Sequence, residues 1–308
     1  MSKPFLKWAG GKYTQLADLF VHIPAGKRLI EPFVGGGAVF LNSDKHADYL
    51  LADVNPDLIN LYQMLAVVPD EVELKARWKF EHMRSSDGYE LIRSEFNAQT
   101  LDATERAAAF LYLNRHCFNG LMRYNQANKF NVGWGGYKAP YYPMDEMKAF
   151  AAMAHNCVFM TADYRRTISL AGKGDVVYCD PPYLPESKTA DFTQYHTEPF
   201  TEDNHRQLVQ ALLEVNRKHG VKVVISNSDT EATRAIYQPF KMHEISVQRS
   251  VSTDKDNRQK AKEVIGVLPV CDCCGRYGGG CPDCGAVMGD ATYNAMVAAG
   301  TFDDQEAF

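Results

Sequence analysis

Residues 201–227 read TEDNHRQLVQALLEVNRKHGVKVVISN and join a helical pattern directly to a strand pattern. Thr201 is a favourable N-cap, and Gly220 is a favourable end because glycine readily adopts the left-handed conformation of a C-terminal cap. The apolar run that follows, 221–227, is short and rich in valine, as expected for a buried strand. A helix that leads into such a strand predicts a crossover connection in an α/β sheet.

Four further apolar runs have the length and composition of buried strands. They are RLIEPF (28–33), DYLLAD (48–53), CVFMTA (157–162) and DVVYCD (175–180). Helical patterns separate several of these runs, which favours a largely parallel sheet. Between the second and the third run, the chain reads as helices and polar loops. We interpret this stretch as a mainly helical domain at 56–144, inserted into an α/β domain formed by 1–55 and 145–270.

Composition limits the kinds of protein that this chain can be. Apolar residues make up 45% of the 308 positions, and no apolar run approaches the roughly 20 residues of a membrane span. The N-terminus lacks the apolar segment of a signal peptide. We therefore expect a cytoplasmic protein without a membrane partner, and we also expect it to be a monomer.

Charge is distributed unevenly along the chain. The formal net charge is −5, but residues 286–308 contain four acidic residues and no lysine or arginine. Residues 107–144 have the opposite balance, because they contain no acidic residue and carry the basic residues Arg115, Arg123, Lys129 and Lys138 among many aromatic residues. A positive local field of this kind is compatible with binding to nucleic acid, although a basic stretch is also typical of an ordinary solvated face.

Three features indicate a nucleotide-like cofactor. EPFVGGGAVF (31–40) places three glycines after a strand, where a ligand can approach the backbone closely. Asp53 ends a later strand and could accept hydrogen bonds from a ribose. In KWAGGK (7–12), Trp8 could cover an aromatic ligand and Lys12 could meet a carboxylate. The strict dinucleotide pattern is missing, and a tight turn, a buried tryptophan and a surface lysine would also explain these residues.

The stretch VVYCDPPYLP (176–185) ends a strand in a carboxylate followed by two prolines and an aromatic residue. Prolines have no N–H group and a fixed φ, so Asp180, Pro181, Pro182 and Tyr183 should form a rigid turn at the end of the strand. Such a turn could simply terminate the strand, but that explanation does not account for Tyr183.

Five motifs taken in order, KWAGGK, EPFVGGGAVF, ADVN, FLYLNRHCFNGLMRYN and DPPY, resemble the DNA adenine-N6 methyltransferase (Dam) family. The resemblance covers residues 1 to 268. It implies a Rossmann-like S-adenosylmethionine-dependent methyltransferase domain with an inserted, mainly helical target-recognition domain at 56–144. The cofactor pocket would be lined by Trp8, Lys12, Phe33, Gly35, Gly37, Asp53, Asp163, Tyr164 and Asp180.

The chemistry of adenine methylation explains the DPPY turn. The exocyclic amine of adenine is a poor nucleophile because its lone pair is delocalised into the ring. The Asp180 carboxylate and the Pro181 carbonyl could accept its two hydrogens and direct the nitrogen at the methyl sulfonium for in-line displacement. Tyr183 would stack on an adenine rotated out of the duplex, and Pro182 would help to keep the turn rigid.

The resemblance also implies a double-stranded DNA partner and the target GATC. Phe118 would fill the space left by the flipped base, Asn119 would support the orphan base, and Leu121 and Arg123 would read neighbouring bases. Lys7 would contact an outer guanine, and the candidates for phosphate contacts are Arg93, Arg115, Asn125, Asn131 and Lys138. Gly133 and Gly136 replace a proline and an arginine expected for the family, which leaves the flank preference open.

The C-terminal segment contains a separate motif, which the resemblance does not cover. Cys271 and Cys274, and then Cys281 and Cys284, form two Cys-x2-Cys pairs, which predict one structural Zn²⁺ in a cytosolic protein. We therefore predict a zinc knuckle at 271–285 and an acidic tail at 286–308. Cys273 is expected to be a spectator or a competing ligand, and Cys117, Cys157 and Cys179 are expected to be core thiols.

Two other functions remain possible on the sequence alone. An RNA amine methyltransferase could use a DPPY-like turn, but it would not require both KWAGGK and LNRHCFNGLMRYN (113–125). A protein that binds DNA without catalysis would not need an intact Asp53, Asp180 and Tyr183. The sequence therefore favours adenine methylation in DNA.

Overall fold

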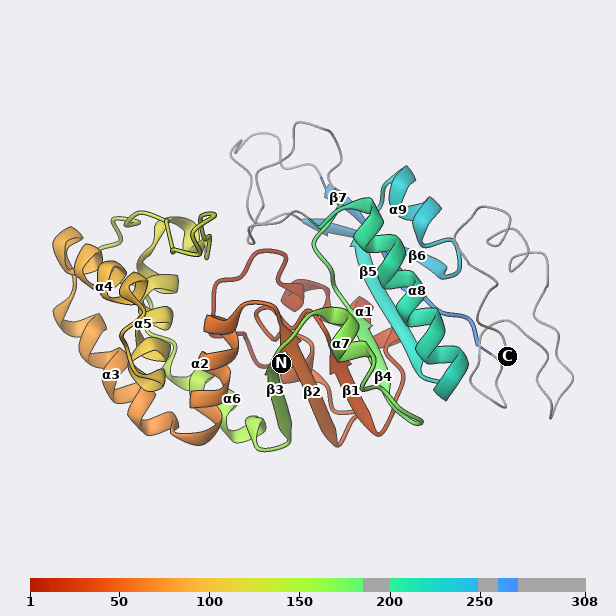
Figure 1. The fold of residues 1–308 in the computed structure, drawn as a ribbon, viewed down its shortest axis with the longest axis horizontal. Coiled ribbons are helices and arrows are strands. Elements are labelled where there is room, and N and C mark those ends of the chain that lie inside the picture. The colour runs from red at the N-terminus through yellow and green to blue at the C-terminus, as the bar shows by residue number, and fades with distance from the viewer. Residues whose placement is uncertain (185–199, 249–259, 271–308) are drawn as a thin grey trace, which may run out of the picture. The chain divides into compact units, whose positions relative to one another are not determined.

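A computed structural model describes residues 1–184, 200–248 and 260–270 (Figure 1). The chain divides into two compact units, which we describe separately. Within the described ranges, the first unit consists of Met1–Ala17 and Phe33–Asp163, and the second of 18–32, 164–184, 200–248 and 260–270. The predicted zinc knuckle at 271–285 and the acidic tail at 286–308 lie outside the described residues.

The described part of the chain contains seven strands, which form a sheet in the order β3-β2-β1-β4-β5-β7-β6. Their bounds are β1 Arg28–Glu31, β2 Asp48–Asp53, β3 Cys157–Thr161, β4 Val176–Cys179, β5 Lys222–Ser228, β6 Lys241–Gln248 and β7 Lys260–Val267. The pairs β2·β3, β1·β4 and β4·β5 are parallel, whereas β7 is antiparallel to both β5 and β6. The α/β prediction, with strands at the five runs, is therefore confirmed, but the expected burial is wrong for β3, where only Phe159 is buried because the strand lies at the edge of the sheet. The antiparallel pair β6·β7 is an element that the sequence patterns did not predict.

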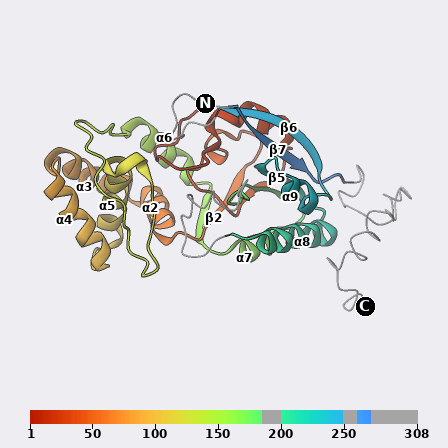
Figure 2. The same cartoon turned by 90° about the horizontal axis from the view of Figure 1, so that it is seen from above.

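Helix α8, Glu202–His219, has the ends that the sequence predicts. Thr201 accepts a hydrogen bond from the backbone of Asn204, whose side chain in turn bonds the backbone of Thr201, so both form a capping box. Gly220 ends the helix with φ +67°. Helix α8 contacts β5 (Figures 1 and 2), and its buried residues include Leu208 and Leu212. The crossover from α8 to β5 is thus as expected.

The first unit is helical between β2 and β3. Its helices are α2 Pro56–Val67, α3 Pro69–His82, α4 Ser86–Ala98, α5 Ala103–His116 and α6 Met144–Ala154. Helix α5 is central to this group, because residues 107–114 are all buried and the helix contacts α2, α3 and α4. The helical character agrees with the sequence pattern, while the proposed domain boundaries remain a prediction.

The short helices of the two units are η1 Lys12–Gln15, α1 Leu16–His22, η2 Phe40–Asn42, η3 Phe118–Gly120, α7 Tyr164–Ile168 and α9 Glu231–Ile236.

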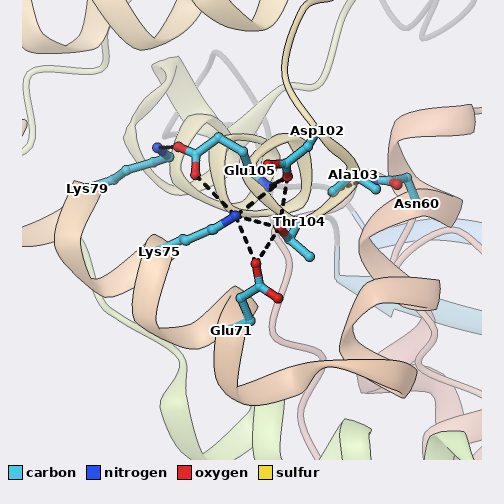
Figure 3. A network of polar contacts seen from close by, with 8 residues as sticks. All are labelled: Asn60, Glu71, Lys75, Lys79, Asp102, Ala103, Thr104 and Glu105. Atoms are coloured by element: carbon cyan, nitrogen blue, oxygen red, sulfur yellow. Dashed lines mark hydrogen bonds and ion pairs between the residues drawn. The ribbon is translucent and has the colours of Figure 1, made fainter.

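A polar network fastens α3 to the start of α5 (Figure 3). The Lys75 ammonium lies 3.0 Å from a Glu71 carboxylate oxygen and donates a hydrogen bond to Thr104 Oγ1 at 2.6 Å. Asp102, the N-cap of α5, accepts from the backbone N–H of Glu105 at 2.7 Å, which holds the pKa of Asp102 below its usual value. The buried Lys79 forms an ion pair with Glu105. These contacts set the register of α5 against α3.

Within the described residues, we find no helix long and apolar enough to cross a membrane.

Candidate active site

In the first unit, the glycine loop adopts a conformation that only glycine can adopt without strain. Gly35 has φ +46° and Gly37 has φ +77°. A Cβ atom on Gly35 would lie 3.0 Å from Cδ1 and Nε1 of the Trp8 ring, and one on Gly37 would lie 2.5 Å from Phe40 Cε1. Trp8 therefore packs directly over the backbone of the loop. Sequence reasoning placed both groups at one site, and the structure brings them together.

Asp53 ties this loop to the end of β2. Its Oδ2 accepts a hydrogen bond from the Gly35 backbone N–H at 3.2 Å, and its Oδ1 accepts one from the Asn55 N–H at 3.0 Å. The side chain is largely buried, with 8% exposed. Tyr62 on α2 donates from its hydroxyl group to the Gly35 carbonyl oxygen at 2.6 Å. Hydrogen bonds thus join the loop to the acid, and one role of Asp53 is to order the backbone of the loop.

The other candidate cofactor residues lie around these groups or at strand ends. Lys12 is buried, and its ammonium donates to the Gly10 carbonyl oxygen at 2.9 Å. Phe33 is half-buried at the start of the loop. Asp163 is exposed just beyond β3 in the first unit, whereas Tyr164 is buried in α7 of the second unit. Their roles toward a cofactor remain predictions.

In the second unit, Asp180 follows β4 and is held by a side chain from β5. Ser226 Oγ donates to Asp180 Oδ1 at 2.8 Å. The same Ser226 oxygen lies 2.9 Å from the Tyr178 hydroxyl oxygen. Because serine has a single proton, which goes to Asp180, Tyr178 must donate to Ser226. A fully buried chain of two hydroxyl groups thus orients the carboxylate.

Tyr183 is held by β7. Its hydroxyl group donates to Glu263 Oε2 at 2.7 Å, and Glu263 is 6% exposed. Burial first, and then the negative charges of Asp180 and Glu263, raise the pKa of Tyr183 well above its usual value, so its hydroxyl group stays protonated and remains a donor. Leu184 N–H donates to Asn227 Oδ1 at 3.4 Å. The turn is therefore fixed on both sides of Tyr183.

Sequence reasoning missed these anchoring residues, Ser226, Asn227 and Glu263. The first two belong to the strand run VKVVISN, where polar residues at the end of an apolar strand were a usable signal. No sequence signal connects Glu263 with Tyr183, because β7 was not predicted. Cys179 is buried, and its pKa lies well above its usual value because of burial and of Asp180, so it is a core thiol as expected.

The Pro181 carbonyl differs from its neighbours in the turn. Pro181 is buried, whereas Pro182 is exposed. No donor within the described ranges hydrogen-bonds the Pro181 carbonyl oxygen. This oxygen and the Asp180 carboxylate are two acceptors on consecutive residues, which is the arrangement that a primary amine can bind.

The segment after α5 in the first unit forms a hairpin-like loop. Backbone bridges join Cys117 to Trp134 and Tyr124 to Phe130. The pattern of residues 113–125 predicts a helix that ends near Gly120, but α5 ends at His116 and only a 3-10 turn, Phe118–Gly120, follows. The helix stops because Cys117 is already extended, with φ −72° and ψ 161°. Asn119 and Gly120 then have φ values of +55° and +70°, which do not allow an α-helix to continue. Below, residues 117–134 are called the reader hairpin.

The predicted base-contacting residues lie mainly at the surface of the reader hairpin. Phe118 is 56% exposed, an unusual state for phenylalanine, and the neighbouring Asn119 is also exposed. Leu121 is half-buried, and Arg123 is exposed with its Nε donating to Asn131 Oδ1 at 3.1 Å. Lys7 places its ammonium 4.6 Å from the centre of the Tyr137 ring. The pKa of Lys7 is lowered, first by burial and then by the charge of Arg115.

The predicted phosphate-contacting residues differ in the hydrogen bonds that their side chains form within the protein. Arg115 donates to the Tyr141 carbonyl oxygen at 3.0 Å, and Arg93 donates to the Val132 carbonyl oxygen at 3.3 Å. Asn125 closes the tip of the hairpin by accepting from two backbone N–H groups. Lys138 is exposed. Each of these side chains except Lys138 thus forms a hydrogen bond within the described part of the chain. Contact with phosphate remains a prediction for all of them.

A seven-stranded α/β sheet that carries the glycine loop and the DPPY turn at strand ends defines a methyltransferase of the α/β class. Residues 8–251 match the model of the D12 class N6 adenine-specific DNA methyltransferase family, and the chain belongs to this family.

Curated relatives support this assignment. The DNA adenine methylase of Serratia marcescens is 46% identical over 265 residues, which cover 86% of this chain and 97% of that protein. That of Escherichia coli K12 is 44% identical over 265 residues, covering 86% and 94%. The DNA N-6-adenine-methyltransferase of Escherichia phage P1 is 45% identical over 268 residues, but the match spans only 35% of that longer protein.

Similarity to solved structures is weaker. A magnesium protoporphyrin IX methyltransferase from Synechocystis PCC 6803 with bound SAM aligns over 83% of this chain and 77% of that chain with a TM-score of 0.33 and 10% identity. The assignment rests on the family match and the curated relatives.

Proposed function

We propose that this protein transfers a methyl group from S-adenosylmethionine to the N6 amine of adenine in duplex DNA, within the sequence GATC. The observation that carries the proposal is the pair of acceptors in the turn, Asp180 and Pro181. Ser226 holds the Asp180 carboxylate, and the Pro181 carbonyl accepts from no group in the described chain. Family membership supplies the reaction class.

The residues of the first unit fit S-adenosylmethionine. The glycine loop carries no Cβ atoms at positions 35 to 37 and packs against the Trp8 ring, and Asp53 is held at the loop by two backbone amides. When bound, the cofactor supplies an electrophilic methyl group on sulfur. The residues of this unit that we propose to hold it are Trp8, Lys12, Phe33, Gly35, Gly37, Asp53 and Asp163.

Asp180 and Pro181 would activate the amine. Each accepts one N–H hydrogen, which favours a tetrahedral nitrogen and directs its lone pair outward. Two fixed acceptors stabilise the positive charge that develops on nitrogen, and no covalent intermediate with the enzyme is required. The rigid turn contributes by holding both oxygens in place before the substrate arrives.

Tyr183 and the reader hairpin would present the base. Adenine N6 cannot be reached inside the stack, so the base must rotate out of the duplex, and Tyr183 offers a ring on which it can stack. The exposed ring of Phe118 is suited to fill the vacated space, with Asn119 beside it. Arg123, held by Asn131, is suited to a bidentate contact with guanine, with Leu121 and Lys7 reading further positions.

Transfer of labelled methyl groups tests the proposal. The purified chain is incubated with labelled S-adenosylmethionine and one of three substrates. These are a DNA duplex that contains GATC, a DNA duplex that contains a single-base variant of GATC, and an RNA of the corresponding sequence. We expect label on N6 of adenine only with the GATC duplex. The Asp180→Asn protein should still bind S-adenosylmethionine and duplex DNA. Its single-turnover rate should be lower by roughly 100-fold or more, since a neutral amide is a weaker acceptor. Equal labelling of all duplexes would contradict the target, and labelling of RNA alone would contradict the substrate class.

A further inference from the structure

His205 is a completely buried imidazole next to the DPPY turn. It lies in the first turn of α8 and has 0% of its surface exposed. Its Nε2 is 3.1 Å from the carbonyl oxygen of Pro182, and its Nδ1 is 2.7 Å from the hydroxyl oxygen of Tyr237. The ring of Phe200 packs edge-on at 4.7 Å between centroids. Both ring nitrogens are therefore used.

The two hydrogen bonds determine the protonation of the ring. A carbonyl oxygen can only accept, so Nε2 carries a proton and donates it to Pro182. Burial lowers the pKa of His205 to about 4, so the ring is neutral at pH 7 and Nδ1 has a free lone pair. Burial raises the pKa of Tyr237 well above its usual value, so its hydroxyl group is protonated and donates to Nδ1. Tyr237 thus selects the tautomer that donates to Pro182.

The turn depends on such an external donor. Two consecutive prolines have no N–H groups, so the turn can be held at these positions only through its carbonyl oxygens. The Pro181 oxygen is the proposed acceptor for the substrate amine. Its neighbour, the Pro182 oxygen, is the one that His205 holds. Rotation about the Cα–C bond of Pro181 would move the Pro181 oxygen. Because the ring of Pro182 fixes its φ, the same rotation would displace the Pro182 oxygen as well, and the bond to His205 opposes this displacement.

We propose that His205 is a positioning residue for methyl transfer. Through Pro182 it keeps the Pro181 carbonyl and the Asp180 carboxylate in the geometry that binds the amine, and Tyr237 keeps His205 in the required tautomer. This inference rests on the proposed function, because binding of the amine by Asp180 and Pro181 is part of that proposal. His205 itself does not touch the substrate.

Three substitutions separate this role from simple packing. His205→Leu removes both hydrogen bonds but stays apolar. His205→Gln keeps one donor and one acceptor on a side chain of similar reach, and Tyr237→Phe removes only the bond that selects the tautomer. His46→Leu is the control for loss of a buried imidazole, because His46 bonds Ser43 and packs against Tyr49, and neither belongs to the turn.

Single-turnover methyl transfer at saturating cofactor and DNA is the main readout, with dissociation constants measured alongside. We expect His205→Leu to lower the rate by ~10- to 100-fold, because small displacements of reacting groups are costly. Its dissociation constants for S-adenosylmethionine and duplex should stay within about threefold, His205→Gln should retain nearly the full rate, and Tyr237→Phe should be intermediate. A His205→Leu protein with the normal rate, or one that loses no more rate than His46→Leu, would overturn the inference.

A second measurement is independent of activity. The ¹⁵N chemical shifts of the His205 ring in the full chain should show a protonated Nε2 and an unprotonated Nδ1 at pH 7, and Tyr237→Phe should shift this balance. The opposite tautomer in the unsubstituted protein would overturn the inference. Failure of the unsubstituted chain to methylate DNA, with the expected tautomer observed, would instead contradict the proposed function.

Discussion

Tyr124 donates a hydrogen bond from its hydroxyl group to Asp57 Oδ2 at 2.7 Å, across 67 positions of the sequence. Asp57 lies in the first turn of α2 and is 5% exposed, and its other oxygen accepts from Arg106 Nε at 2.6 Å. The helix start that follows Asp53 therefore also anchors the reader hairpin and α5. Alternation along the hairpin points Tyr124 inward while its neighbour Arg123 is exposed.

Removal of the Tyr124 hydroxyl group should destabilise the fold. Tyr124→Phe leaves a buried carboxylate with one donor fewer, so we expect a loss of about 1–3 kcal/mol in the free energy of unfolding, measured by urea denaturation. Tyr141→Phe is the matched control, because Tyr141 donates to Glu146 at the exposed surface and should change nothing measurable. Equal effects of both substitutions would refute the anchoring role of Asp57.

Replacement of Arg123 should change discrimination more than affinity. We expect Arg123→Ala to reduce the preference for the correct base pair by roughly 1–3 kcal/mol at one position, measured from methyl transfer on single-base variants of GATC. Asn131→Ala should have a smaller effect on discrimination in the same direction, since it frees the Arg123 side chain without removing it. Lys138→Ala should weaken binding to all duplexes alike and should reduce the salt dependence of that binding. A uniform loss with Arg123→Ala would make that residue a phosphate contact instead.

Gly133 offers a test of the departure from the family pattern. A Cβ atom there would meet nothing within 4 Å, and the Gly133 N–H donates no hydrogen bond within the described part of the chain. Gly133→Pro should therefore change stability by no more than ~0.5 kcal/mol and should alter the preference at outer positions of the site.

Gly135→Ala is the counterpart of that substitution. Its Cβ atom would lie 2.3 Å from Tyr137 Cε2 and 2.9 Å from the Cys117 carbonyl oxygen, so we expect a lower melting temperature. If Gly133→Pro is as destabilising as Gly135→Ala, the hairpin geometry is incompatible with proline and the comparison with the family pattern is wrong.

Stability should fall as the pH decreases below 6.5. Burial lowers the pKa of both His116 and His205 from 6.5 to about 4, so the unfolded chain binds protons at these positions before the folded chain does. The free energy of unfolding is therefore highest above pH 6.5, where both imidazoles are neutral in the folded and the unfolded chain. It decreases progressively between pH 6.5 and pH 4, by at most ~3 kcal/mol for each residue. Urea midpoints between pH 5 and 7, above the range of most carboxylates, measure this slope. His116→Gln should flatten it, and an unchanged slope would contradict the assignment to His116.

The predicted zinc knuckle is tested by metal content. We expect one Zn²⁺ per full-length chain, bound by Cys271, Cys274, Cys281 and Cys284, and none in a chain that ends at Val270. The cysteines that remain there are Cys117 and Cys179, both buried, and Cys157, which is half-buried. The described residues also contain no group of three or more metal-binding side chains. Zinc in the truncated chain, determined by elemental analysis, would refute the ligand assignment.

Local signals in the sequence determined the elements that depend on neighbouring residues. Thr201 and Gly220 delimit α8 because capping is an interaction within one turn. The five short apolar runs became strands, although only Phe159 is buried in β3 at the edge of the sheet. The glycine loop and the DPPY turn were readable for the same reason, since positive φ values and missing N–H groups are properties of single residues.

Tertiary structure decided the partners of these residues. The bonds of Ser226 to Asp180, Glu263 to Tyr183, His205 to Pro182 and Tyr124 to Asp57 join positions separated by 46, 80, 23 and 67 residues. The strand β7 that carries Glu263 was not predicted, because an antiparallel strand can be placed only once its neighbours in the sheet are known. A sequence specifies which groups can donate and accept, but only the folded chain, by excluding water, determines which of them must bond to each other.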